Sequence, residues 1–187
     1  KFNHNPVIIG AGPAGLMAAL FLAKSGLNPI LFERGASVEE RDKAVSAFWN
    51  HGELDRNNNV LFGEGGAGLF SDGKLTSRSK DRPAVRFLME TLVECGAPVS
   101  ILYDAEPHVG SDRLKKIIPN IRKKIIENGG TIQFNSTVKD LIITNHKLTG
   151  IMVNKEVIKT DVCILATGHS ARDVYKFLAC SEVALEA

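Results

Sequence analysis

A short apolar run that leads directly into closely spaced glycines constrains this chain most. Residues 7–9 are Val-Ile-Ile, which predicts a buried strand, and the sequence GAGPAG follows at residues 10–15 without a gap. A helical pattern comes next, and a second apolar run at residues 29–32 stops at Glu33. The segment therefore predicts a strand, a glycine turn, a helix and a second strand.

Each glycine of this motif has its own expected role. Gly10 permits a tight turn, Gly12 lets the backbone approach a pyrophosphate, and Gly15 lets the helix pack close to the strand. Phosphates would then face the free N–H groups and the positive dipole end of the helix. Glu33 follows Gly15 by eighteen residues, where a carboxylate accepts hydrogen bonds from both hydroxyls of an adenosine ribose. The segment predicts a dinucleotide site of the kind that FAD and NAD share; the alternative is an ordinary βαβ turn with Glu33 on the surface.

A second glycine-rich stretch lies at residues 63–73, where five of eleven residues are glycine. Ordering so many glycines costs much conformational entropy. Glycine is nevertheless favoured where the backbone must closely approach a flat or anionic group, because it has no Cβ. We expect a cofactor-facing loop whose N–H groups meet phosphate or a flavin ring. The alternative is a flexible surface loop.

Composition limits the classes of function. The chain has 187 residues with 23 Lys and Arg against 21 Asp and Glu, a formal net charge of +2 that gives no general case for binding nucleic acid. The apolar residues 16–23 are far too few for a bilayer span of about 20 residues, so no membrane association is predicted. Cys95, Cys163 and Cys180 are far apart and without metal-ligand spacing, so we expect no metal site and three small buried residues in a reducing cytoplasm.

Further helices and strands are predicted by period and capping. Ser37 and Glu40 form a capping box that starts a helix, and Ser111 caps a later helix in which Pro119 predicts a kink or two abutting helices. The other expected helices cover residues 83–95 and about 171–178, the last capped by Ser170. The expected antiparallel strands cover residues 131–134, 138–144, 148–153 and 157–158, with a turn at Asn145-His146, and a buried strand covers 162–166.

Three separated signals carry a resemblance to a known superfamily: GAGPAG with its distal Glu33, the predicted antiparallel meander, and a strand that ends in Ala166-Thr167-Gly168. This order resembles the FAD-binding domain of glutathione-reductase-like and related flavoproteins. The phrases FGEGGAGLFSDGKL and ILATGHSARDVY are similar to an uncharacterised group of bacterial FAD-dependent dehydrogenases or oxidoreductases. The resemblance implies an α/β, three-layer, Rossmann-like FAD/NAD(P)-binding domain over residues 1–187, with a parallel sheet and a small antiparallel meander.

The resemblance also implies a set of cofactor-binding residues. The pyrophosphate would lie against the first glycine motif, the ribose at Glu33, the adenine beside Arg34 and Val138, and the pyrophosphate and flavin along the second glycine loop. The implied cofactor-binding residues are Gly10, Gly12, Pro13, Ala14, Gly15, Glu33, Arg34, Gly65, Gly66, Ala67, Val138, Ala166, Thr167 and Gly168. His169, next to this turn, is a candidate base or anion-binding group.

The expected function is FAD-dependent oxidation or reduction of an unidentified small molecule, with NAD(P)H as a candidate electron donor. Such domains close with a strand ending in Gly-Asp, which this sequence lacks, so we expect the N-terminal part of a longer flavoprotein, without its substrate domain. One alternative is an NAD(P)-dependent dehydrogenase with Arg34 near the adenosine 2′ position. Another is a non-catalytic flavin or nucleotide sensor, or a relative of RNA-modification flavoproteins that grips RNA through basic residues 115–124.

Overall fold

A four-stranded parallel sheet forms the middle of the molecule. In this computed structural model, which describes residues 2–71, 73–75, 79–181 and 183–186, the strand order is β3-β2-β1-β7. The strands are β1 (Val7–Ile9), β2 (Ile30–Phe32), β3 (Thr131–Gln133) and β7 (Cys163–Leu165). Each is parallel to its neighbours, as the βαβ pattern predicts, and the three residues of β1 are buried.

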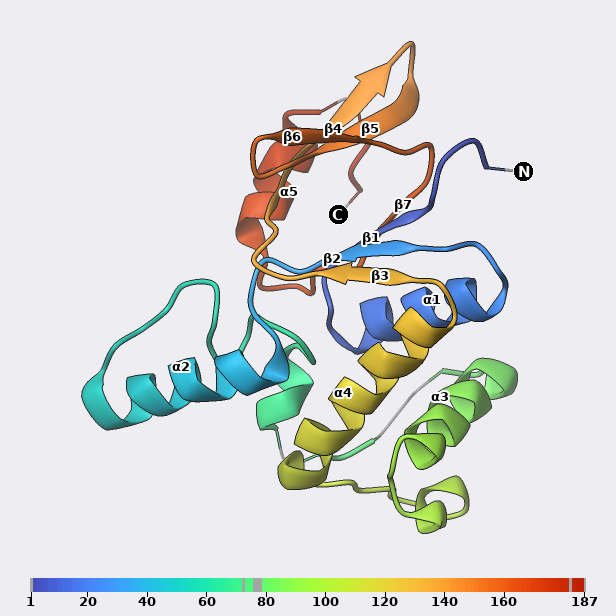
Figure 1. Ribbon diagram of the computed structural model, residues 1–187, viewed down its shortest axis with the longest axis vertical. Coiled ribbons are helices and arrows are strands. Elements are labelled where there is room, and N and C mark those ends of the chain that lie inside the picture. The colour runs from blue at the N-terminus through green and yellow to red at the C-terminus, as the bar shows by residue number, and fades with distance from the viewer. Residues whose placement is uncertain (1, 72, 76–78, 182, 187) are drawn as a thin grey trace.

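Helices cover one face of this sheet. The helices α1 (Pro13–Lys24) and α4 (Ser111–Glu127) lie directly beneath the strands, and α3 (Arg82–Glu94) lies beyond them (Figure 1). Apolar residues at helical spacing make this core, because Leu16 and Leu20 of α1 and Ile121 and Ile125 of α4 are fully buried. Two predictions for α4 are corrected: Gly110, rather than Ser111, is its N-cap, and one helix instead of two abutting helices contains Pro119. The alternative expectation of a kink at Pro119 stays a prediction.

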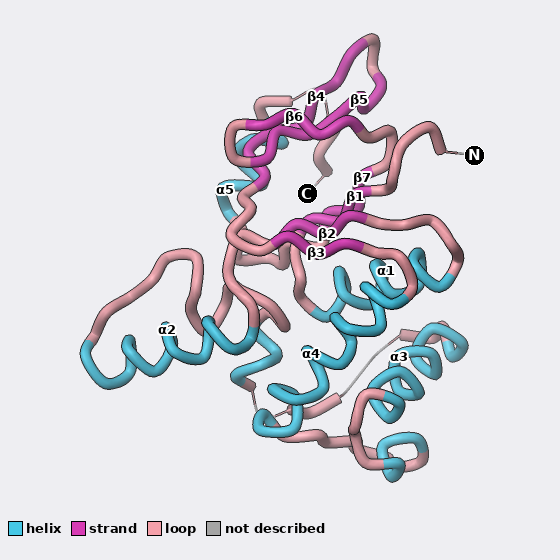
Figure 2. The backbone as a smooth tube through the Cα atoms, in the orientation of Figure 1, coloured by secondary structure: helices cyan, strands magenta, loops and turns pink. Residues whose placement is uncertain are grey.

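A three-stranded antiparallel sheet covers the other face, giving the predicted three layers (Figure 2). Its strands are β4 (Val138–Thr144), β5 (Lys147–Val153) and β6 (Glu156–Lys159). The two sheets share an apolar core in which Val7, Ile9 and Phe32 pack with Val138 and Ile151. The expected turn at Asn145-His146 is confirmed, since both residues have positive φ, 50° and 59°.

The segment at residues 131–134 was expected in this antiparallel meander, and that prediction is wrong. Thr131–Gln133 is β3 and pairs in parallel with Ile30–Phe32. Alternation over three or four residues identifies a strand but not its partner, which here lies about 100 residues earlier in the chain.

The remaining elements are two helices and two short 3₁₀ helices outside the layers described so far. They are α2 (Val38–His51), the short 3₁₀ helices η1 (Ala67–Phe70) and η2 (Val99–Leu102), and α5 (Arg172–Ala179). Ser37 is the N-cap of α2 as predicted, but its side chain makes no capping hydrogen bond, and the N-cap of α5 is Ala171 instead of Ser170. Helix α2 extends away from the helices under the sheet, to the left in Figure 1.

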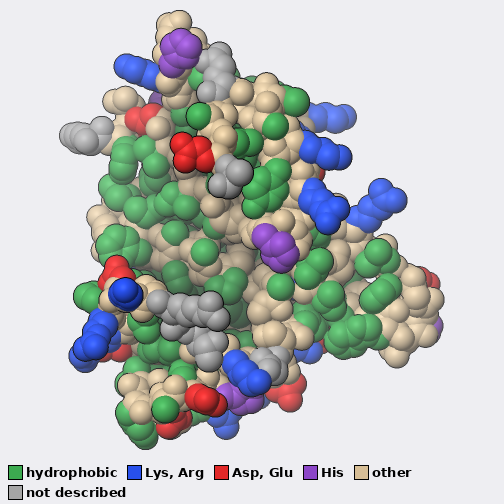
Figure 3. All heavy atoms as spheres, turned by 180° about the vertical axis from the view of Figure 1, so that it is seen from behind, with side chains coloured by type: hydrophobic (Ala, Val, Ile, Leu, Met, Phe, Trp, Pro, Cys, Tyr) green, Lys and Arg blue, Asp and Glu red, His purple; other side chains and the backbone are tan. Residues whose placement is uncertain are grey.

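The three cysteines differ in how far they are buried. Cys95 is buried and Cys163 is half-buried, whereas Cys180 is exposed, which corrects the prediction for Cys180. No helix among the described residues is both long enough and apolar enough to cross a membrane. On the face opposite to that of Figure 1, hydrophobic side chains occupy much of the middle, while Lys and Arg lie toward the edges (Figure 3).

Candidate nucleotide-binding site

A cavity of about 350 Å³ lies at the carboxyl ends of β1, β2 and β7, where the chain leaves each strand. This edge is where open parallel sheets bind ligands. The residues from the predicted set that line it are Gly10, Gly12, Pro13, Ala14, Glu33, Arg34, Gly66, Ala67, Val138, Ala166, Thr167 and Gly168. Gly15 and Gly65 were also predicted and do not line the cavity. The fold thus brings five separate segments of the chain together around one space.

The three glycines of the first motif differ in what surrounds them. Gly10 has φ of +103°, and a Cβ there would lie 2.6 Å from the carbonyl oxygen of Ala166. A Cβ on Gly15 would overlap the carbonyl oxygen of Gly10. Gly12 has an ordinary φ of −72°, and the nearest atom to a Cβ there would be the Cα of Gly66, 3.9 Å away. Gly10 and Gly15 therefore maintain the turn, whereas Gly12 keeps open the space in front of the helix.

The N-terminus of α1 faces this space without a protein anion. Its N-cap Gly12 has no side chain to cap the helix, Pro13 occupies the first turn, and no acidic residue lies in that turn. The first backbone N–H groups of a helix have no intrahelical acceptor, and they carry the positive end of its dipole. The arrangement is suited to an anion, and a phosphate is the commonest one at such a position.

Glu33 is buried and holds three loops together. Its Oε2 accepts a hydrogen bond from the N–H of Ala11 at 2.7 Å, and its Oε1 accepts from Gly35 at 2.9 Å and Gly63 at 3.2 Å. Only 5% of the residue is exposed. The carboxylate therefore connects the first glycine turn to the end of β2 and to the second glycine-rich loop, a role that was not predicted; its contact with a ribose stays a prediction.

Arg34 lies between a carboxylate and an aromatic ring at the rim of the cavity. Its Nη2 lies 3.0 Å from Oδ2 of Asp173, on α5, and 3.1 Å from Oδ1. Its guanidinium carbon lies 4.7 Å from the centre of the Phe62 ring. Although burial pushes the pKa of Asp173 upward, the hydrogen bond and the charge of Arg34 hold it below its usual range.

The second glycine-rich loop is hydrogen-bonded to the first, and Gly66 and Ala67 line the same cavity. That this loop faces a cofactor stays a prediction. The N–H of Gly65 donates to the carbonyl of Ala11 at 2.8 Å, and a Cβ on Gly66 would lie 3.0 Å from the Cα of Gly12. The two backbones thus approach more closely than side chains would permit. Asp72, within the predicted loop, lies outside the described residues.

The buried side chain of Arg41 binds the backbone of this loop on the side away from the cavity. Arg41 is fully buried and donates from Nη1 to the carbonyls of Gly63 at 3.3 Å and Glu64 at 2.6 Å. Burial lowers the pKa of Arg41 to about 10, with the carboxylates of Glu33 and Glu64 opposing the shift. The guanidinium carbon also lies 4.9 Å from the centre of the Phe70 ring. Arg41 therefore fixes the backbone of the loop rather than the contents of the cavity, because it does not line it.

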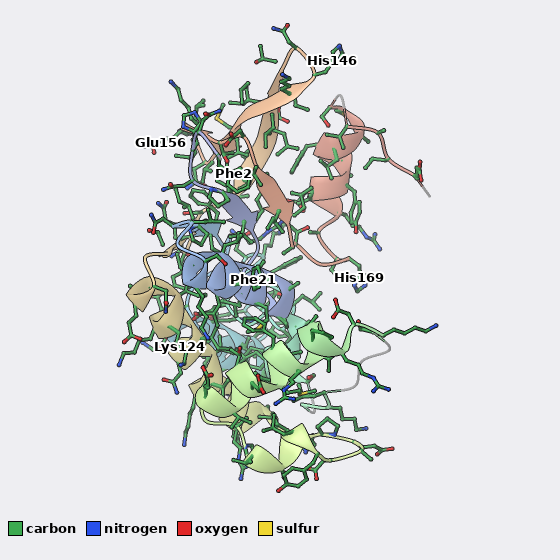
Figure 4. The ribbon with its side chains drawn as sticks, turned by 90° about the vertical axis from the view of Figure 1, so that its right-hand side faces the viewer. Phe2, Phe21, Lys124, His146, Glu156 and His169 are labelled. Atoms are coloured by element: carbon green, nitrogen blue, oxygen red, sulfur yellow. The ribbon has the colours of Figure 1, made fainter. Side chains whose placement is uncertain are left out.

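Several cavity residues were not predicted from the sequence. Phe62, Ser136 and Val174 complete the wall beside Arg34 and Val138. Phe62 and Val174 lie within the two longer phrases that carried the resemblance, but no cofactor-binding role was assigned to them. His169 does line the cavity, is exposed, and lies on the turn between β7 and α5 (Figure 4). The described residues contain no group of three or more His, Cys, Asp or Glu side chains that could hold a metal ion.

Comparison with known proteins agrees with this geometry over part of the chain. Residues 4–47 match the model of a family described as an FAD binding domain. An uncharacterized protein of Clostridium beijerinckii is 46% identical over 187 residues, which make up 100% of this chain and 35% of that protein. A probable electron transfer flavoprotein-quinone oxidoreductase of Escherichia coli is 22% identical over 171 residues, 89% of this chain and 37% of that protein. The chain thus spans about a third of the length of these curated relatives.

Among solved structures, THI4 of Thermovibrio ammonificans has a similar fold. The two superimpose with a TM-score of 0.61 at 20% identity, covering 97% of this chain and 64% of that one. At this level of identity the similarity supports the three-layer α/β architecture.

Proposed function

We propose that this chain binds FAD in the cavity at the carboxyl ends of β1, β2 and β7 and forms the nucleotide-binding part of a flavin-dependent oxidoreductase. The observation that carries the proposal is the open N-terminus of α1, where Gly12 leaves room for a pyrophosphate. The match of residues 4–47 to an FAD binding domain supports the choice of FAD. Bound flavin would supply hydride or electron transfer.

The residues present fit an adenosine diphosphate in one orientation. The pyrophosphate would take hydrogen bonds from the backbone N–H groups of Gly12 and Ala14, since Pro13 between them has none. The ribose hydroxyls would lie near the remaining acceptor positions of Glu33. The adenine would lie toward Val138 and Phe62, which give that end of the cavity apolar walls. We propose NAD(P)H as the electron donor; the substrate is a small molecule that this part of the protein does not identify.

The proposal is tested by the cofactor that the protein holds. The chain is purified without added cofactor, the ligand is released by heat, and its absorbance spectrum and chromatographic mobility are measured. Apo-protein is then titrated with FAD and, separately, with NAD. FAD that copurifies, or FAD binding much tighter than NAD binding, is expected. A colourless protein that FAD does not reconstitute would overturn the proposal, and tight binding of NAD alone would favour the nicotinamide alternative.

Two alanine variants separate the role of the cavity from that of the fold. Gly12→Ala places a Cβ in front of α1 without backbone strain. We therefore expect at least a tenfold loss of FAD affinity, which corresponds to about 1.4 kcal/mol of binding free energy. Its unfolding in the absence of ligand should be unchanged. Gly15→Ala is the matched contrast, because its Cβ overlaps the carbonyl of Gly10, and it should lose both stability and binding.

The RNA-binding alternative gains little support from the basic residues of α4. Lys115 pairs with Asp42 at 2.5 Å, Arg122 with Glu39 at 2.7 Å, and Lys124 with Glu94 at 3.1 Å. These cations are already neutralised by neighbouring elements. Binding of RNA that weakened steeply with added salt would revive the alternative.

A further inference from the structure

Arg34 is placed where a second kind of adenosine nucleotide would be recognised. It follows Glu33, at the end of β2, and both line the cavity. In dinucleotide sites of this type, the acid at this position binds the ribose 2′-hydroxyl, and a nearby arginine accommodates a 2′-phosphate where one is present. The sequence alone therefore leaves both nucleotides open.

The contacts of Arg34 decide between them. Both carboxylate oxygens of Asp173 lie within 3.1 Å of its Nη2, and one face of the guanidinium covers the Phe62 ring. The Arg34 side chain is only 17% exposed, whereas that of Asp173 is 54% exposed. The charge that would attract a phosphate is thus already matched, and it is held against the wall of the cavity.

The ring under Arg34 is itself fixed by its loop. The side-chain Oδ1 of Asn59 accepts hydrogen bonds from the N–H of Leu61 at 2.9 Å and of Phe62 at 3.2 Å, and the N–H of Asn59 donates to the carbonyl of Phe62 at 3.2 Å. Asn59 is buried. The guanidinium is consequently positioned from two sides, by α5 and by the loop before the second glycine run.

We propose that Asp173 determines nucleotide specificity by holding Arg34 in this ion pair, so that the cavity accepts an adenosine with a free 2′-hydroxyl and rejects a 2′-phosphate. The inference rests on the proposed adenosine-nucleotide site and names the residue that sets its selectivity. Asp173 does not itself line the cavity and acts through Arg34: a 2′-phosphate would have to displace it from Arg34 and would face the negative charge of Glu33. Arg172, beside Asp173, is exposed and does not line the cavity.

The test compares two probes that differ only at the 2′ position: ADP-ribose and 2′-phospho-ADP-ribose. Dissociation constants of both are measured by calorimetry for the wild-type chain and for Asp173→Asn, which removes the charge at nearly constant size. We expect the wild type to prefer ADP-ribose, and Asp173→Asn to shift the ratio of the two constants toward the 2′-phosphate by about tenfold, because Arg34 is released. Glu156→Gln, on exposed β6 and remote from the cavity, removes the same charge and should leave the ratio unchanged (Figure 4).

A second substitution makes the result specific to Arg34. Adding Arg34→Met to Asp173→Asn should abolish the gain for 2′-phospho-ADP-ribose, whereas a general electrostatic effect would survive it. An unchanged ratio in folded Asp173→Asn, or a wild type that already prefers the 2′-phosphate, would refute the inference and leave the proposed FAD site intact. Failure of the wild type to bind either probe or FAD would instead refute the site itself.

Discussion

Glu64 caps helix α2 from a distant loop: its Oε2 accepts a hydrogen bond from the N–H of Val38 at 2.8 Å. Its Oε1 lies 3.5 Å from Nε of Arg122 on α4, and the residue is fully buried. Val38 is the first residue of α2, and an N-cap side chain accepts from the second or third helical residue, so Glu64 serves a donor that the Ser37 hydroxyl would not cap. The second glycine-rich loop therefore supports α2 and α4 as well as lining the cavity.

Removing the Glu64 carboxylate should destabilise the chain strongly. We expect Glu64→Ala to lower the free energy of unfolding by about 2–4 kcal/mol, because the cap of α2 is lost, a cavity is left in a buried site, and Arg122 keeps only Glu39 as a carboxylate partner. Glu64→Gln keeps an acceptor for Val38 and should cost less. Urea denaturation followed by circular dichroism measures both, with Glu90→Ala, which breaks a surface ion pair on α3, as the control expected to change little. Equal stabilities for all three variants would contradict the capping role.

The same carboxyl predicts a pH dependence of stability. Burial raises the pKa of Glu64 to about 6, above its ordinary value of 4.5, although Val38 and Arg122 oppose the shift. Between pH 4.5 and pH 6 the folded chain binds more protons than the unfolded chain. The contribution of the protonated Glu64 carboxyl to the free energy of unfolding is therefore full below pH 4.5 and is lost as the pH rises through 6. The change amounts to about 2 kcal/mol. The difference in stability between wild type and Glu64→Gln should fall by this amount from pH 4.5 to pH 7; a flat difference would exclude the raised pKa.

Glu33 should contribute to the stability of the ligand-free protein as well as to ligand binding. Glu33→Gln replaces one acceptor oxygen by an NH₂ group that faces backbone N–H donors, so we expect the ligand-free chain to lose about 2 kcal/mol of unfolding free energy. Glu156→Gln serves as the matched surface control. Thermal and urea denaturation without nucleotide measure the effect. If only FAD affinity changed, Glu33 would serve the ribose alone.

The three cysteines should react at separate rates. Cys180 is exposed, whereas burial raises the pKa of the Cys95 thiol and raises that of Cys163 to about 12. Because the thiolate is the reactive form, one equivalent of a thiol reagent should be consumed quickly at pH 8 and the other two slowly. Replacing Cys180 with Ser should remove the fast phase. If the fast phase persisted in the Cys180→Ser variant, the rapidly reacting thiol would be Cys95 or Cys163, and the prediction would be wrong.

Local patterns predicted most of the fold and the floor of the site. The apolar run at residues 7–9, the glycine turn and the helix after it depend on sterics and periodicity within a few residues, and the structure has them as expected. Most residues expected around the cavity line it for the same reason, since the carboxyl ends of parallel strands meet at one edge.

What the sequence did not predict depends on contacts between distant segments. Nothing local to Thr131–Gln133 reveals that its partner is β2, and nothing around Asp173 points to Arg34. Glu64 lies within a glycine run whose composition indicates a flexible or cofactor-facing loop, so its burial beneath α2 has no local signal. The same holds for Phe62, which acquires a role only because Asn59 shapes its loop.

The position of β1 between β2 and β7 has a consequence for how the protein is made. Strand β1 leaves the ribosome well before its second neighbour, β7, which is synthesised about 150 residues later, roughly 8 to 30 s at ordinary elongation rates. Until then, one side of β1 has no partner, and the turn after β7 that forms part of the cavity does not yet exist. Loading of a nucleotide during synthesis must therefore wait until nearly all of these residues have been translated, and the nascent chain exposes a hydrophobic strand edge for that interval.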